Sequence, residues 1–150
     1  MITYVKRNIF AMNVEAIVNT VNCKGAFGKG LAYQFHLQYP ASTQKYKAAC
    51  NSHTLKVGTV LLVDQTNDTL PNLRFVVHFP TKDDWRDPSE LSYIRSGCRA
   101  LRESVIDHNI KSIAIPPLGC GLGRLKWGDV RSIIEAELKD LDCIVYVIEP

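Results

Sequence analysis

The chain has 150 residues, of which 46% are hydrophobic and 22% are charged. This length and composition are typical of one soluble domain with its own core, and they exclude a disordered chain, a collagen and a coiled coil. The net charge of +3 is unevenly spread, because residues 1–56 hold seven basic side chains and a single acidic one. A basic third of a small domain indicates either a face for nucleic acid or phosphate, or a solvated surface without a partner.

The sequence lacks the signals of membrane insertion, export and metal binding. It contains no apolar run of about 18 residues, which a membrane-spanning helix requires. The basic pair Lys6-Arg7 follows a short apolar stretch, which is the wrong order for a signal peptide. The five cysteines are widely spaced, without the C-x-x-C pair that indicates zinc or redox chemistry. We therefore expect a monomeric cytoplasmic protein with reduced thiols, no membrane contact and no metal.

Short β-rich runs alternate with helical patterns along the whole chain. Alternating or continuous apolar residues predict strands at residues 2–6, 16–21, 58–64, 73–79, 111–115 and 143–148. The last of these is apolar throughout, which is typical of a strand buried on both faces. Helices are predicted at residues 29–39, 41–51, 88–108 and 127–141. This interleaving predicts a single α/β domain over residues 1–150, a sandwich around a mixed sheet.

Two glycine-rich loops, at residues 23–30 and 119–124, each lie between an expected strand and an expected helix. Glycine permits positive φ and lets backbone N–H groups approach a ligand, while a helix N-terminus favours phosphate. Two such loops suggest a diphosphate held from both sides; the alternative is that each is only a tight turn. Neither has the spacing of a P-loop or of the G-x-G-x-x-G fingerprint, which disfavours a nucleoside triphosphatase and a dinucleotide-dependent oxidoreductase.

Polar side chains precede the first loop and follow the strand at 73–79. Asn19 and Asn22 end an apolar strand, where an amide needs hydrogen bonds and suits the hydroxyls of a sugar. The alternative, a pair of asparagines that closes a turn, is more serious for Asn19 than for Asn22. Lys82 stands at the carboxyl end of a strand, where it can bind phosphate, act as a nucleophile or be an ordinary surface lysine. Trp85 and Arg86 can stack on a base and contact a phosphate, or cover the start of the next helix.

Three segments together resemble the macrodomain family, and within it the branch of the DNA ADP-ribosyl glycohydrolase DarG. They read NTVNCKGAFGKGLAYQF at 19–35, FPTKDDWR at 79–86 and PPLGCGLGRLKW at 116–127. The sequence is also similar to the related terminal ADP-ribose glycohydrolases, and the likeness covers nearly the whole chain. It implies a three-layer α/β/α sandwich with a central mixed sheet that binds ADP-ribose.

The resemblance also implies a reaction and the residues that perform it. DarG antitoxins remove the ADP-ribose that the toxin DarT attaches to a thymine of single-stranded DNA, so the expected activity is that of an ADP-ribosyl glycohydrolase. Lys82 matches the family's catalytic lysine, and Asn22 matches the asparagine that positions the distal ribose. Trp85 and Arg86 are expected to contact DNA. The residues expected to bind ADP-ribose are Asn8, Ile9, Thr20, Lys29, Gly30, Pro117, Gly119, Cys120, Gly121, Leu122 and Gly123.

Four positions depart from the family pattern or separate its branches. Asn8 stands where many macrodomains have an acid that contacts adenine, which implies weaker discrimination of that base. Gly123 stands where relatives that remove ADP-ribose from glutamate have an aspartate, so hydrolysis of such protein esters is only the alternative function. Non-enzymatic binding of ADP-ribose and hydrolysis of ADP-ribose-1″-phosphate are further alternatives. Asp83 and Asp84 replace residues that tend to be basic or histidine, which weakens the case for DNA contacts there. No cofactor is implied, and the expected partners are ADP-ribosylated single-stranded DNA and a DarT-like toxin.

Overall fold

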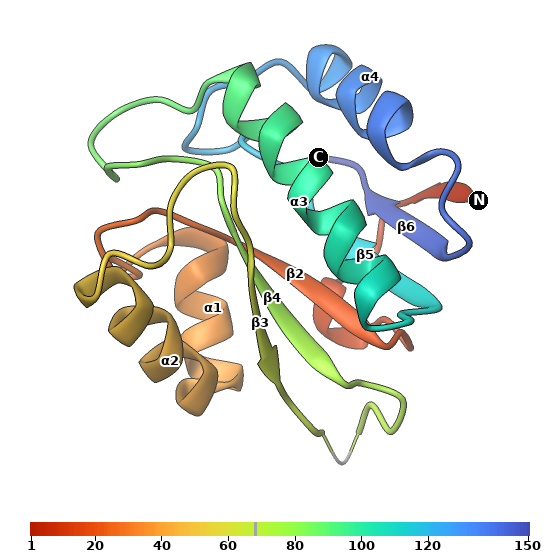
Figure 1. The fold of residues 1–150 in the computed structure, drawn as a ribbon, viewed down its shortest axis with the longest axis horizontal. Coiled ribbons are helices and arrows are strands. Elements are labelled where there is room, and N and C mark those ends of the chain that lie inside the picture. Colours follow the sequence, from red (N-terminus) through yellow and green to blue (C-terminus); the bar gives the residue numbers. More distant parts are fainter. Residues whose placement is uncertain (68) are drawn as a thin grey trace.

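A computed structural model describes residues 1–67 and 69–150 of the protein. Six strands form one sheet in the order β1-β6-β5-β2-β4-β3, in which β3 is antiparallel to β4 and the other pairs are parallel (Figure 1). The strands are β1 (Ile2–Val5), β2 (Ala16–Val21), β3 (Leu61–Asp64), β4 (Phe75–Pro80), β5 (Ser112–Ile115) and β6 (Ile144–Ile148). The helices are α1 (Gly30–Gln38), α2 (Pro40–Asn51), α3 (Leu91–Asp107), α4 (Trp127–Leu138) and a short 3-10 helix, η1 (Ile9–Ala11).

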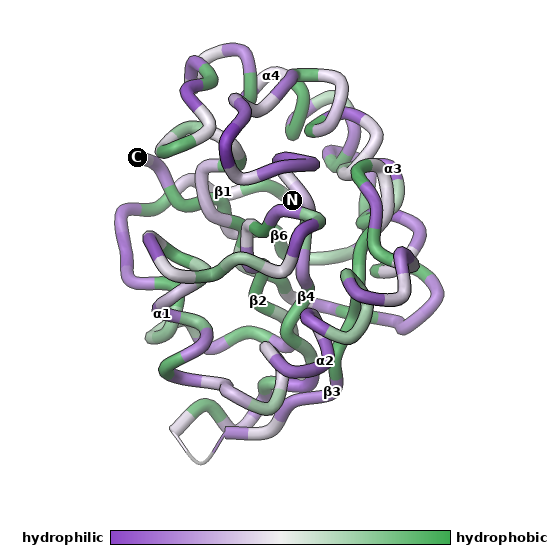
Figure 2. The backbone as a smooth tube through the Cα atoms, turned by 90° about the vertical axis from the view of Figure 1, so that its left-hand side faces the viewer, coloured by the Kyte–Doolittle hydropathy of each residue, from purple (hydrophilic) through white to green (hydrophobic). Residues whose placement is uncertain are grey.

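The helices cover both faces of the sheet. Figure 1 shows α1 and α2 on one side of it and α3 and α4 on the other. The larger apolar core joins α3 and α4 to the sheet, and smaller clusters join α1, η1 and α2 to its opposite face. Hydrophobic colour accordingly concentrates in the central strands in Figure 2. The predicted three-layer α/β/α sandwich with a mixed sheet is therefore confirmed.

The sequence prediction was wrong about the last strand and about several ends. β6 buries Val145 and Val147 against the larger core, but Ile144 on its other face is 43% exposed. That face is covered only in part, because β6 lies next to the edge strand β1. The strands buried on both faces are the central β2, β4 and β5. The expected helix at 88–108 begins only at Leu91, after an extended Glu90, and the strand expected from 58 begins at Leu61.

Gly97 on α3 packs against the ring of Phe79, which is fully buried on β4. A Cβ at position 97 would stand 2.6 Å from Phe79 Cε1, so Gly97→Ala must displace the ring or the helix. We expect this substitution to lower the free energy of unfolding by about 1–3 kcal/mol in urea denaturation, as overpacking does. Gly128→Ala on α4 is the control, because a Cβ at position 128 would have no atom within 4 Å. Equal stability of wild type and Gly97→Ala would contradict this packing.

Within the described ranges, no helix is long and apolar enough to cross a membrane. Nor do three His, Cys, Asp or Glu side chains gather there in a way that could hold a metal ion. Each of the five cysteines is free.

The parallel arrangement brings the loops of interest to one edge of the sheet. Because β1, β2, β4, β5 and β6 run the same way, their carboxyl ends meet at that edge. The segments that follow β1, β2, β4 and β5 include both glycine-rich loops and Lys82. In open α/β sheets this is the edge where ligands bind.

Candidate functional site

A cavity of about 1020 Å³ opens at the carboxyl edge of the sheet. Its walls come from the segments after β1, β2, β4 and β5 and from Ile148 at the end of β6. The volume lies at the upper end of the range of roughly 300–1,000 Å³ that is usual for small-molecule sites, so it accommodates a ligand as large as a dinucleotide. Fourteen of the fifteen predicted site residues line it: Asn8, Ile9, Thr20, Asn22, Lys29, Gly30, Lys82, Trp85, Arg86, Pro117, Gly119, Gly121, Leu122 and Gly123.

Cys120 is the predicted site residue that does not line the cavity. Its side chain packs against the larger apolar core, and its thiol lies 3.6 Å from the backbone oxygen of Leu118. Burial raises the pKa of this thiol above its ordinary value. The Cys120 side chain thus packs inward, as a small half-buried cysteine does, and a contact of this residue with ADP-ribose stays a prediction.

The cavity carries an excess of positive charge. Five cationic side chains line it, against one carboxylate, that of Asp87; the cations are Arg7, Lys29, Lys82, Arg86 and Arg124. An apolar wall with clustered cations attracts a polyanion such as a diphosphate. Arg7 and Lys29 come from the basic first third of the chain, so part of that charge faces a cavity.

Asn22 organises the first glycine-rich loop. Its Oδ1 accepts hydrogen bonds from the backbone N–H groups of Lys24 (2.9 Å) and Ala26 (3.2 Å), and its Nδ2 donates to the Ala26 carbonyl (2.8 Å). The Tyr46 hydroxyl donates to the backbone oxygen of Asn22 at 2.7 Å. Asn22 thus closes a turn as well as lining the cavity, which was the less favoured interpretation of this residue.

Asn8, which also lines the cavity, has a local role as well. It is the N-cap of η1, and its Oδ1 accepts a hydrogen bond of 2.9 Å from the backbone N–H of Phe10. This cap places Ile9 in the cavity wall beside it. The Asn8 side-chain carbonyl has a second lone pair that can accept a further hydrogen bond.

Asn19 does not close a turn. It lies within β2 with its side chain buried, and its Nδ2 is 3.3 Å from His78 Nδ1 on the neighbouring β4. His78 Nε2 contacts Ser42 Oγ at 2.8 Å, and the imidazole stacks on the Tyr46 ring. Sequence reasoning missed this buried polar cluster; its signal was a histidine and an asparagine inside otherwise apolar strands. Through Tyr46 the cluster supports the backbone at Asn22.

His78 makes stability depend on pH. Burial lowers its pKa from 6.5 to about 4. Below pH 6.5 the unfolded chain therefore binds a proton that the folded chain takes up only near pH 4, so the free energy of unfolding falls across this window by up to about 3 kcal/mol. We expect the free energy of unfolding of His78→Gln, measured by urea denaturation, to fall less between pH 6.5 and 4 than that of wild type. Identical pH slopes for the two proteins would contradict this assignment.

The second glycine-rich loop is shaped by two glycines that a side chain would disrupt. Gly119 has φ +72° and its Cβ would stand 2.7 Å from Leu125 Cδ1. A Cβ on Gly123 would stand 2.5 Å from the Gly119 carbonyl oxygen. At the tip, Leu122 is 66% exposed, and its Cδ1 would lie 3.7 Å from a Cβ on Gly30 in the first loop. The two loops therefore approach each other across the cavity, as the diphosphate interpretation requires.

The segment after β4 continues the pairing with β2. Thr81 N–H donates to the Val21 carbonyl, and Cys23 N–H donates to the Asp83 carbonyl, both at 2.9 Å. Thr81 and Lys82 line the cavity, whereas Asp83 does not. Lys82 Nζ lies 3.4 Å from the Trp85 carbonyl oxygen.

Trp85 and Arg86 stand at the rim of the cavity, beside Lys82. The Trp85 side chain is 57% exposed, and the Arg86 guanidinium lies 5.7 Å from its ring centroid. Asp84 accepts hydrogen bonds from Arg86 Nε at 3.0 Å and Nη2 at 2.7 Å, and Arg86 holds the pKa of Asp84 well below its ordinary value. The Asp84 charge is thus compensated locally.

The model of the Macro domain family matches residues 18–134. The chain belongs to the macrodomain family. The macrodomain of Mycobacterium tuberculosis DarG has the same fold, with a TM-score of 0.95 and 38% identity over 100% of this chain and 98% of that one. The structure of Thermosipho africanus DarTG in complex with ADP-ribose matches with a TM-score of 0.94 and 31% identity, over 99% of this chain and 41% of that one.

Among curated proteins, the DNA ADP-ribosyl glycohydrolase of Mycobacterium tuberculosis is 40% identical over 149 residues. The alignment covers 97% of this macrodomain and 42% of that relative, so the macrodomain spans about two fifths of its length. The prediction of a DarG-type macrodomain is confirmed by these matches.

Proposed function

We propose that this macrodomain is an ADP-ribosyl glycohydrolase that removes ADP-ribose from a base of DNA, with thymine as the expected base. The observation that carries the proposal is the position of Lys82, which lines a cationic cavity of dinucleotide size beside the exposed ring of Trp85. An amine in the cavity wall can reach the reacting sugar carbon, while the ring outside offers a surface on which a base stacks. The similarity to DNA ADP-ribosyl glycohydrolases supports the same activity.

The cavity suggests how ADP-ribose is held. Asn8 and Ile9 lie at the end assigned to adenine, and the two glycine-rich loops flank the space assigned to the diphosphate. Lys29 and Arg124, on those loops, supply positive charge for it. We assign Asn22 and Thr20 to the distal ribose, next to Lys82. Binding energy from the nucleotide would thus fix the distal C1″ carbon against the lysine.

In the proposed reaction the Lys82 amine attacks C1″ and the bond between C1″ and the base nitrogen breaks. The electron pair of that bond leaves with the base, which takes up the proton lost by the amine. Opening of the sugar ring gives a Schiff base between Lys82 and C1″. Water then adds to C1″, releasing free ADP-ribose and the original amine. The net reaction consumes one water and restores the unmodified base.

The test compares two substrates side by side. An oligonucleotide that carries ADP-ribose on thymine and a peptide that carries it as a glutamate ester are incubated with the macrodomain, and released ADP-ribose is measured. We expect release from the oligonucleotide to be the faster. Release from the peptide alone would favour the protein-ester alternative, and binding of ADP-ribose without release from either would favour a non-enzymatic binding module.

The proposal includes the source of the substrate. An enzyme of the DarT class would attach the ADP-ribose to single-stranded DNA, and this macrodomain would then act as the corresponding antitoxin. The structural match to Thermosipho africanus DarTG supports this pairing. We expect the macrodomain to act as a monomer.

A further inference from the structure

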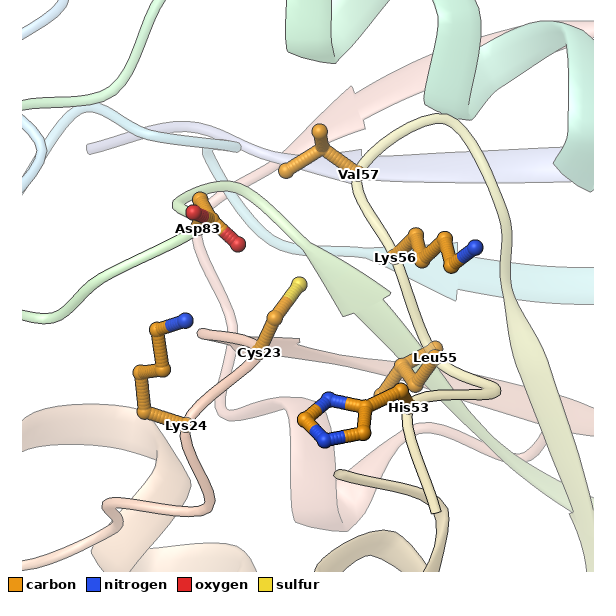
Figure 3. A pocket seen from close by; sticks show the side chains of 7 residues that line it. All are labelled: Cys23, Lys24, His53, Leu55, Lys56, Val57 and Asp83. Atoms are coloured by element: carbon orange, nitrogen blue, oxygen red, sulfur yellow. The ribbon is translucent and has the colours of Figure 1, made fainter. Parts of the chain in front are cut away.

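A second cavity, of about 390 Å³, lies behind the segment that carries Lys82. Figure 3 shows Cys23, Lys24 and Asp83 on one side of it, and the segment from His53 to Val57 on the other. These residues come from three separate parts of the chain. None of them lines the cavity assigned to ADP-ribose.

Residues that are adjacent in the chain line the two different cavities. Asn22 and Lys82 line the first, while their chain neighbours Cys23 and Asp83 line the second. The hydrogen bond from Cys23 N–H to the Asp83 carbonyl, 2.9 Å long, ties the two segments together between them. This adjacency of the lining residues points to a polymer whose modified unit reacts at Lys82 and whose next unit enters the second cavity.

The chemistry of the second cavity fits a nucleotide. Leu55 is buried and Val57 half-buried, which provides an apolar surface for a base, while Lys24 and Lys56 supply cations for the phosphates on either side. The Asp83 carboxylate makes no side-chain hydrogen bond or ion pair with any residue that the structure describes. It is thus a free acceptor within a basic pocket.

The Asp83 carboxylate has a definite hydrogen-bonding preference. A carboxylate accepts hydrogen bonds from an exocyclic amino group, such as N4 of cytosine. The thiol of Cys23 does not compete as an anion, because burial and the Asp83 charge raise its pKa to about 11. Asp83 and Asp84 therefore differ in role, since Asp84 is held by Arg86 and Asp83 is available.

We propose that the second cavity binds the nucleotide next to the modified base in single-stranded DNA, and that Asp83 selects a base with an exocyclic amino group there. This inference rests on the proposed function, because the reacting base must lie at Lys82. It gives Asp83 of the FPTKDDWR segment a role in DNA binding, although negative charge alone disfavours a contact with DNA.

The experiment uses two oligonucleotides that carry one ADP-ribosylated thymine, flanked on both sides by cytosine in one and by thymine in the other. We expect wild type to have a kcat/KM about tenfold higher on the cytosine-flanked strand, and Asp83→Ala to reduce this ratio to about one. Asp140→Ala, which removes an exposed carboxylate beyond the end of α4, is the matched control and should keep the wild-type ratio.

The outcomes separate this inference from the proposed function. Equal rates of wild type on the two strands, with hydrolysis intact, would overturn the inference and leave the glycohydrolase standing. Absence of hydrolysis on both would overturn the proposed function. In that case the cavity is still tested by titrating the protein with unmodified CTC and TTT trinucleotides. The amide chemical shifts of Cys23, His53 and Val57 report binding. Shifts that are equal for the two, or absent, would contradict the assignment.

Discussion

Lys82→Ala is expected to reduce the rate of ADP-ribose release from ADP-ribosylated DNA by at least about 100-fold, as loss of a reacting group does. The substitution removes the amine that attacks C1″ in the proposed reaction. It should leave the fold intact, because the described side-chain interaction of Lys82 is a weak 3.4 Å contact with the Trp85 carbonyl. Single-turnover kinetics on the modified oligonucleotide measures the loss, and titration with ADP-ribose should show affinity within about tenfold of wild type.

Two further variants separate chemistry from charge. Lys82→Arg keeps the positive charge in the cavity but cannot form the Schiff base, so it should be nearly as inactive as Lys82→Ala. Lys139→Ala removes an exposed lysine after α4 and should behave as wild type. Substantial activity in Lys82→Arg would show that the lysine acts by charge alone, and full activity in Lys82→Ala would remove it from the mechanism.

Gly123→Ala is expected to weaken binding of ADP-ribose by at least about tenfold. A Cβ at this position would stand 2.5 Å from the Gly119 carbonyl oxygen and against Ser89, so the second glycine-rich loop must change shape. This loop forms one wall of the cavity, and a displaced loop loses backbone contacts to the diphosphate. Isothermal titration with free ADP-ribose measures the effect without relying on catalysis.

Gly121→Ala is the matched control for this prediction. Gly121 lies in the same loop and also lines the cavity, but a Cβ added to it would have no atom within 4 Å. This variant should therefore bind ADP-ribose more tightly than Gly123→Ala does. Equal affinity of the two variants would contradict the role assigned to the close packing at Gly123.

The elements and the position of the site followed from local patterns. Apolar alternation identified the strands, and the three- and four-residue steps from Leu91 to Val105 identified the longest helix. Because parallel strands have their carboxyl ends at the same edge of a sheet, the two glycine-rich loops and Lys82 were expected at one edge. The residues that carry the resemblance to macrodomains lie on these loops, which explains why nearly all the predicted site residues line one cavity.

What could not be predicted depends on contacts between distant segments. The direction of the Cys120 side chain is set by the core beneath it, and the role of Asn22 by backbone groups of its own loop and by Tyr46. The packing of His78 against Ser42 joins β4 to α2. The second cavity likewise requires residues 53–57 to lie beside Asp83, and no spacing along the chain indicates that.

Cleavage of the bond between C1″ and a base of DNA is best tested by the mass of the DNA product. An oligonucleotide with one ADP-ribosylated thymine is incubated with the macrodomain, and its mass is then measured by mass spectrometry. We expect loss of the whole ADP-ribosyl group, so that the product has the mass of the unmodified strand. A strand that keeps its full ADP-ribosyl mass, or retains a ribose phosphate on the base, would contradict cleavage at C1″.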